Sequence, residues 1–168
     1  MSRVSLSLTV AGGLLVLAAS VAALFQELPA QAGEISVPDH LGPLSLSEQQ
    51  SGASAADEIA RLHGKTFPLA SAVVARYGPN AEATLWVAGT SNEVEAAALM
   101  ESMRGAIAGG DSPFTPLEPM LIDGETVYPL RGMGQEHMYF RSGRLVVWLA
   151  ADPGDAEAAR LAVLEVFR

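Results

Sequence analysis

The sequence contains no cysteine, a single lysine and few aromatic residues. Without cysteine the chain cannot form disulfides, thiolate zinc sites, covalent haem attachments, a cysteine nucleophile or a cysteine-linked lipid anchor. The basic residues stand singly along the chain, and the formal net charge is −9. Because an acidic surface without a basic cluster repels a phosphate backbone, these features exclude nucleic acid as a partner.

Charge is also absent from most of the N-terminal segment. After one arginine, the chain is uncharged from Val4 to Phe25. This run exceeds the roughly 7–15 apolar residues of a signal peptide and reaches the roughly 20 that span a bilayer. The small-x-small pattern at Ala30–Ala32 instead indicates a signal-peptidase site. We therefore predict that residues 1–32 are a cleaved signal peptide or a retained transmembrane anchor, and that residues 33–168 form an extracytoplasmic domain.

Residues 33–168 show alternating strand and helix signals. Ser54 and Thr90 each precede an acidic residue by three positions, which predicts two capped helices, and a third helix is expected after Asp155. The second helix carries an apolar stripe of Ala96, Leu99, Met100, Met103 and Ile107. Hairpins are predicted from Ala72–Tyr77 with Ala83–Val87, from Met120–Ile122 with Thr126–Tyr128, and from His137–Phe140 with Leu145–Leu149. The predicted fold class is α+β, a mainly antiparallel sheet with helices packed on one face, preceded by an N-terminal hydrophobic helix.

The two tryptophans suggest an internal repeat. Trp86 and Trp148 are 62 residues apart, and the same offset superposes Tyr77 on Tyr139. The interpretation is two ββα-type units, arising by duplication or by convergence of two ordinary units. Strand alternation places both tryptophans on one face of the sheet. That face either carries another layer of structure or is a partner-binding surface.

A segment rich in glycine precedes one predicted strand. Gly132 and Gly134 flank Met133, and Gln135 and His137 follow. Two glycines before a strand indicate a bulge or a close backbone contact, and they lack the third glycine and the following helix of a phosphate loop. The candidate ligand- or partner-binding residues are therefore Trp86, Trp148, Gly132, Gly134, Gln135 and His137.

The same segment offers soft metal ligands. Met133, His137 and Met138 combine thioether and imidazole groups, which favour Cu(I). In a strand, however, His137 and Met138 point to opposite faces, and the alternative is a half-buried histidine bonded to the backbone. His63, at the end of a predicted helix, is expected to cap the last carbonyls.

No catalytic or cofactor motif is present. The chain lacks G-x-S-x-G and S-x-x-K, and its paired carboxylates lie at predicted helix starts and on a hairpin. A Ser-His-Asp hydrolase site assembled only by the fold stays open, since a triad is defined by geometry. We predict no cofactor and a non-enzymatic binding or accessory module, contacting an exported or membrane protein or a small ligand. A copper-handling protein and a fold-assembled hydrolase are the alternatives.

Overall fold

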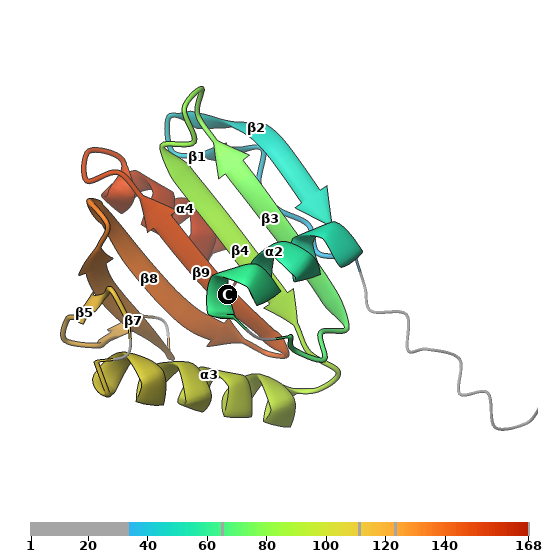
Figure 1. The fold of residues 1–168 in the computed structure, drawn as a ribbon. Coiled ribbons are helices and arrows are strands. Elements are labelled where there is room, and N and C mark those ends of the chain that lie inside the picture. The colour runs from blue at the N-terminus through green and yellow to red at the C-terminus, as the bar shows by residue number, and fades with distance from the viewer. Residues whose placement is uncertain (1–33, 65, 111, 123, 168) are drawn as a thin grey trace, which may run out of the picture. The chain divides into compact units, whose positions relative to one another are not determined.

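The computed structural model describes residues 34–64, 66–110, 112–122 and 124–167. The predicted signal peptide or membrane anchor, residues 1–32, lies outside the described residues. Within the described ranges, no helix combines the length and apolarity that crossing a membrane requires. These ranges form a curled antiparallel sheet with three helices (Figure 1).

The sheet confirms the mainly antiparallel α+β fold. Its order is β1-β2-β3-β4-β9-β8-β7-β5, and β6 pairs with β7. The three predicted hairpins are present, as β3–β4, β6–β7 and β8–β9. The strands are β1 (His40–Leu41), β2 (Leu44–Ser51), β3 (Ser71–Tyr77), β4 (Ala83–Gly89), β5 (Thr115–Pro116), β6 (Met120–Ile122), β7 (Glu125–Gly132), β8 (Gln135–Ser142) and β9 (Leu145–Ala151).

The three helices are α2 (Ala53–His63), α3 (Glu93–Ala108) and α4 (Ala156–Val166). Neither predicted capping box forms. Ser54 donates its hydroxyl to a carbonyl of the preceding strand, and α3 is capped by Asn92, whose side chain accepts from the Glu95 amide. The N-cap of α2 is Gly52, which has no side chain to accept a hydrogen bond. At α3 the Thr90 hydroxyl donates to the Asn92 and Arg144 carbonyls, and the short polar side chain of Asn92 takes the cap instead. The helix α2 ends at Gly64, which takes a left-handed φ of 64°.

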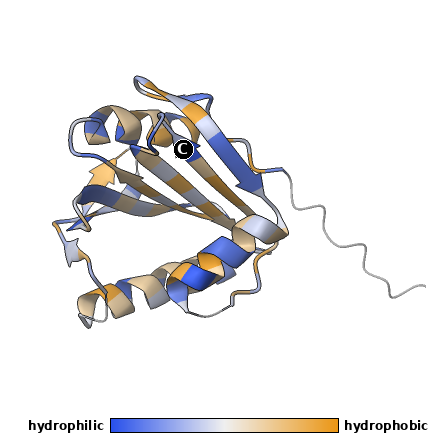
Figure 2. Ribbon diagram, turned by 45° about the horizontal axis from the view of Figure 1, so that its top comes forward, coloured by the Kyte–Doolittle hydropathy of each residue, from blue (hydrophilic) through white to orange (hydrophobic). Residues whose placement is uncertain are grey.

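The helices cover both faces of the sheet, so the prediction of helices on one face is wrong. On one face, α4 packs Ala159 and Val163 into a core that includes Leu85 and Phe140. On the other face, α2 and α3 cover a cluster that includes Val74. The central strands are apolar on both sides, which is typical of strands buried between two layers. Figure 2 shows this as orange and tan central strands beside the blue outer strand β2.

The predicted repeat holds only for the central strand pair. Trp86 lies directly opposite Trp148, so a local two-fold axis normal to the sheet relates β4 to β9 at the 62-residue offset. A rotation about this axis keeps each face of the sheet on the same side, so it would place the helices that follow β4 and β9 on one face. Instead, α3 and α4 lie on opposite faces. Tyr77 and Tyr139 also lie on opposite faces, since their hairpins have loops of different length. The offset therefore describes β4 and β9, not two equivalent ββα units.

Candidate binding site

A row of aromatic residues crosses the face that α2 and α3 cover. Tyr128 of β7, Tyr139 of β8, Trp148 of β9 and Trp86 of β4 each lie directly opposite the next. The rings of Tyr128 and Tyr139 stack with centroids 5.1 Å apart, and those of Tyr139 and Trp148 at 5.3 Å. We call these four residues the aromatic row. Its first three members form one continuous stack.

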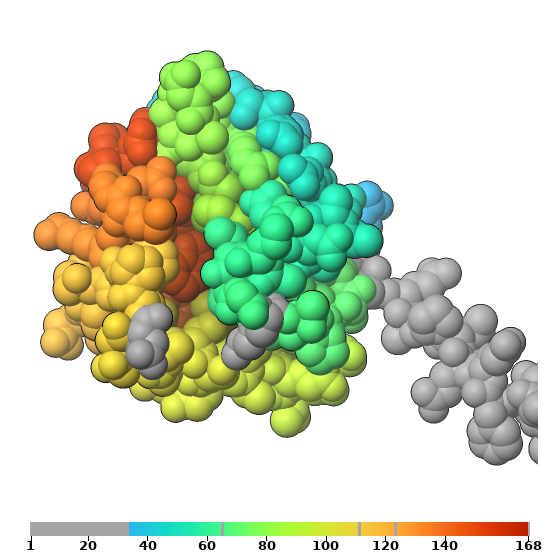
Figure 3. Space-filling model, in the orientation of Figure 1, coloured from blue at the N-terminus to red at the C-terminus, as the bar shows by residue number. Residues whose placement is uncertain are grey.

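The aromatic row is partly exposed. Tyr139 is buried at its centre, whereas Tyr128, Trp148 and Trp86 keep some access to solvent. Figure 3 shows a hollow at this place, in which orange-red β9 is visible between orange β8 and the teal of α2. The tryptophan face thus carries a further layer of structure, and its two tryptophans remain accessible between the parts of that layer.

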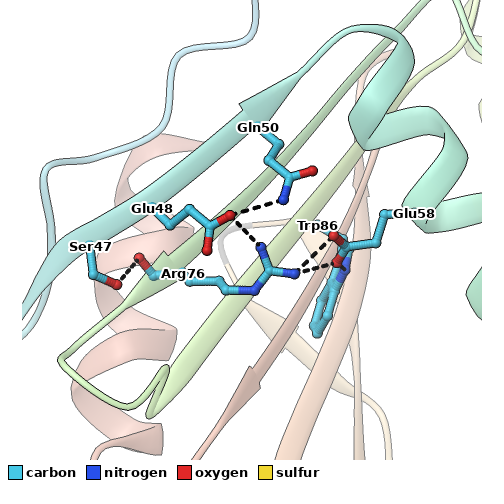
Figure 4. A network of polar contacts seen from close by, with 6 residues as sticks. All are labelled: Ser47, Glu48, Gln50, Glu58, Arg76 and Trp86. Carbon is cyan, nitrogen blue, oxygen red and sulfur yellow. Dashed lines mark hydrogen bonds and ion pairs between the residues drawn. The ribbon is translucent and has the colours of Figure 1, made fainter.

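A polar network fixes one side of the hollow (Figure 4). Arg76 of β3 donates from Nη2 to both carboxylate oxygens of Glu58 on α2, at 2.8 Å each. The Trp86 indole donates to Oε1 of the same carboxylate at 3.2 Å. Only 14% of the Glu58 side chain is exposed. One carboxylate therefore ties α2 to β3 and holds the indole N–H of Trp86 toward the helix.

His137 lies beside the stack, on the neighbouring register row of β8. The Trp148 indole donates to Nδ1 at 3.2 Å, so Nε2 carries the proton and donates to the Gly132 carbonyl at 3.1 Å. Both ring nitrogens are therefore used in the neutral form. Burial lowers the pKa of His137 below its usual range, and the carbonyl of Gly132 only partly opposes this. Phe114 packs its ring 4.7 Å from His137 and 5.2 Å from Trp148.

The glycines predicted as site residues have structural roles. A β-carbon on Gly132 would lie 2.6 Å from Phe114 Cδ1 and 2.8 Å from the Pro113 carbonyl oxygen, which confirms the predicted close contact. Gly134 has a φ of 81° in the tight turn between β7 and β8. Gln135 donates its side-chain amide to Asp152 at 3.1 Å. These contacts shape the β7–β8 turn and the start of β8.

The proposed copper ligands are not brought together. Met138 is 3% exposed in the core beneath α4, whereas His137 lies on the opposite face. Met133 is 78% exposed in the β7–β8 turn. Within the described part of the chain, no group of three or more His, Asp or Glu side chains is placed to hold a metal. His63 caps α2 as expected, with Nδ1 2.8 Å from the Ile59 carbonyl oxygen.

The tyrosine end of the aromatic row opens into a pocket that sequence reasoning missed. Its volume is about 300 Å³, and it lies between α3 and the β5–β7 edge. The Arg104 guanidinium lies over the Tyr128 ring, 5.3 Å from its centroid. A second pocket of about 390 Å³ shares Glu101, Arg104 and Tyr128 with the first. We call the first one the α3 pocket.

The residues of this pocket could not be predicted from the sequence, because their alignment depends on the register between strands. Tyr128 and Tyr139 fall inside predicted strands, but their alignment with Trp148 depends on β7, β8 and β9 pairing in a particular register. Arg104 belongs to no sequence motif that would have marked it as a binding residue.

Comparison of the chain with family models, with curated proteins and with solved structures found no match. The function is therefore inferred from the geometry of the site.

Proposed function

We propose that this chain is a non-enzymatic binding or accessory module that acts outside the cytoplasm. It contacts a protein partner or a small ligand through the hollow that holds the aromatic row. The observation that carries the proposal is the partial exposure of Trp86, Trp148 and Tyr128 in one concave, helix-flanked site. Partly exposed tryptophan and tyrosine side chains in such sites are typical anchors of binding surfaces.

The hollow is preorganised, which favours binding. Trp148 stacks on Tyr139 and donates to His137, and Trp86 donates to Glu58. Each indole therefore has a held orientation before any ligand arrives. Because fewer side chains have to be ordered on association, such a site loses less conformational entropy when it binds.

The location outside the cytoplasm rests on the N-terminal sequence. An uncharged run behind a single arginine indicates export, with the domain on the outer side of the membrane. There the net charge of −9 favours partners that present positive charge toward the domain. An exported protein, or the outer part of a membrane protein, with a basic contact surface fits both features.

Affinity purification of the tagged full chain from gently solubilised membranes tests this function. Mass spectrometry of the intact complex detects a protein companion and a retained small molecule in the same experiment. We expect one of the two at near-equal stoichiometry with the wild-type chain. The site variant is Tyr128→Ala, which removes a partly exposed ring at the end of the aromatic row.

Leu161→Ala is the matched control. Leu161 is 60% exposed on α4, the helix that covers the opposite face of the sheet. The companion is expected to be lost with Tyr128→Ala and kept with Leu161→Ala. A wild-type chain that carries neither protein nor small molecule contradicts the proposed function. A companion retained equally by both variants moves the binding surface away from the aromatic row.

A further inference from the structure

The α3 pocket differs from the rest of the site in its lining. It is mainly apolar, with Ile107 of α3, Leu130 of β7 and three prolines around the rings of Tyr128 and Tyr139. Its volume of about 300 Å³ lies at the lower limit of small-molecule sites, which suits a compact ligand. An apolar lining of this kind favours a ligand body that is itself apolar.

Two polar groups of the pocket are free to bind a ligand. Tyr139 is 2% exposed and lines the pocket, and its hydroxyl makes no hydrogen bond to any residue in the described ranges. Burial raises the pKa of this phenol to about 12, so the hydroxyl keeps its proton as a donor. Arg104 uses one nitrogen on Glu101, which leaves other guanidinium donors at the pocket.

From this arrangement we infer that the α3 pocket binds a small carboxylate with an apolar body, recognised by Arg104 and the Tyr139 hydroxyl. This inference rests on the proposed function and names the ligand class for the tyrosine end of the same site. The apolar body would lie against Tyr128 and the aliphatic lining. The carboxylate would accept from the guanidinium and from the phenol.

The charges around the pocket favour a carboxylate over an amine. Arg104 is the cation among the described residues that line it, and it would repel an ammonium group. Glu101 offsets this cation in the free protein, but 72% of its side chain is exposed. Exposed ion pairs stabilise proteins weakly, so a ligand carboxylate in the α3 pocket can replace Glu101 as the partner of Arg104, whose own side chain is 47% exposed.

Three compounds with the same apolar body test the choice of head group. The probes are 4-phenylbutyrate, 4-phenylbutyramide and 4-phenylbutylamine, which are anionic, neutral and cationic near pH 7. Binding to the full chain is followed by saturation-transfer NMR and by tryptophan emission, since Trp148 stacks on Tyr139. We expect the butyrate to bind about tenfold more tightly than the amide, because it gains a charged hydrogen bond, and the amine to bind most weakly.

Two conservative variants assign the contacts. Tyr139→Phe keeps the stacked ring and removes the hydroxyl, and Arg104→Met keeps an apolar stem and removes the charge. Each is expected to weaken butyrate binding by about fivefold to tenfold, with a much smaller effect on the amide for Arg104→Met. Arg61→Met is the control, since Arg61 is exposed on α2 and does not line the pocket. Circular dichroism and the thermal midpoint of each variant show that the fold is kept.

The outcomes separate the inference from the proposed function. Equal affinity for the three compounds, tightest binding of the amine, or no binding of the butyrate overturns the carboxylate assignment. Butyrate binding that both site variants leave unchanged overturns it too. If a companion is lost with Tyr128→Ala while no probe binds, the proposed function stands and this inference fails. If neither a companion nor a probe binds, both fail.

Discussion

Glu58 is the residue whose removal should reveal how the hollow is held together. Its carboxylate accepts two hydrogen bonds from Arg76 and one from the Trp86 indole, and 14% of its side chain is exposed. Glu58→Ala leaves a guanidinium that is 25% exposed without its main partner, together with an unpaired indole N–H. Hydrogen bonds to charged groups contribute about 1.5–3 kcal/mol each, and breaking a fully buried ion pair costs about 3–5 kcal/mol.

Because Arg76 is partly exposed, the expected loss of stability is smaller than for a fully buried ion pair. We expect Glu58→Ala to lower the free energy of unfolding by about 2–3 kcal/mol. Glu58→Gln, which can still accept from Trp86 and Arg76, should lose about half as much. The control is Glu48→Ala. Glu48 contacts the same arginine, but at 3.5 Å and with 53% of its side chain exposed, so its removal should cost about 0.5 kcal/mol.

Urea unfolding of the full chain, followed by circular dichroism and tryptophan emission, gives the three free energies. The emission also reports on Trp86 directly, since its indole loses a hydrogen-bond partner in Glu58→Ala. If Glu58→Ala and Glu48→Ala destabilise the chain equally, Glu58 does not fasten α2 to β3 in the way described. If Glu58→Ala strongly lowers the free energy of unfolding but leaves the tryptophan emission unchanged, the ion pair with Arg76 is supported and the contact to the Trp86 indole is refuted.

Three further predictions concern single residues. Because the folded chain holds His137 neutral with a lowered pKa, stability should fall as pH drops below about 6.5, and this component should disappear in His137→Gln when unfolding is measured from pH 7.5 to pH 5. Gly132→Ala forces a β-carbon against Phe114 and should lower the free energy of unfolding by about 1–3 kcal/mol. Gly105→Ala, in an open helical position, should raise it by about 0.5–1 kcal/mol. Thermal unfolding of both variants checks the contrast. Met133 has a φ of 54°, so Met133→Asn should raise the midpoint of thermal unfolding by a small amount, and an unchanged or lower midpoint would contradict strain at this turn.

Hairpins and helix faces were predictable because their signals are local. Alternation within Ala83–Gly89 and Leu145–Ala151 correctly placed both tryptophans on the face opposite Leu85. The stripe on α3 correctly placed Met100 and Ile107 inward. Leu62 of α2 is apolar but 63% exposed, because this helix packs on the sheet through Ala55 and Ile59.

The candidate site was only half predictable. Trp86 and Trp148 could be proposed from their spacing, but Tyr128, Tyr139 and Arg104 could not. A strand pattern shows which residues share a face and leaves open which residues of another strand they meet. The pairing of β4 with β9, rather than with a neighbour in sequence, brings the tryptophans together.

By itself, then, the sequence determined the three hairpins, the three helices of the described residues, the shared face of the two tryptophans and the net negative charge. These follow from periodicity, turn chemistry and composition, which act over a few residues. Only the tertiary structure decided that helices cover both faces, that four aromatic residues form one row, and that Arg104 closes one end of it. Those features depend on the register between distant strands, which is set by how two cores pack against one sheet at the same time.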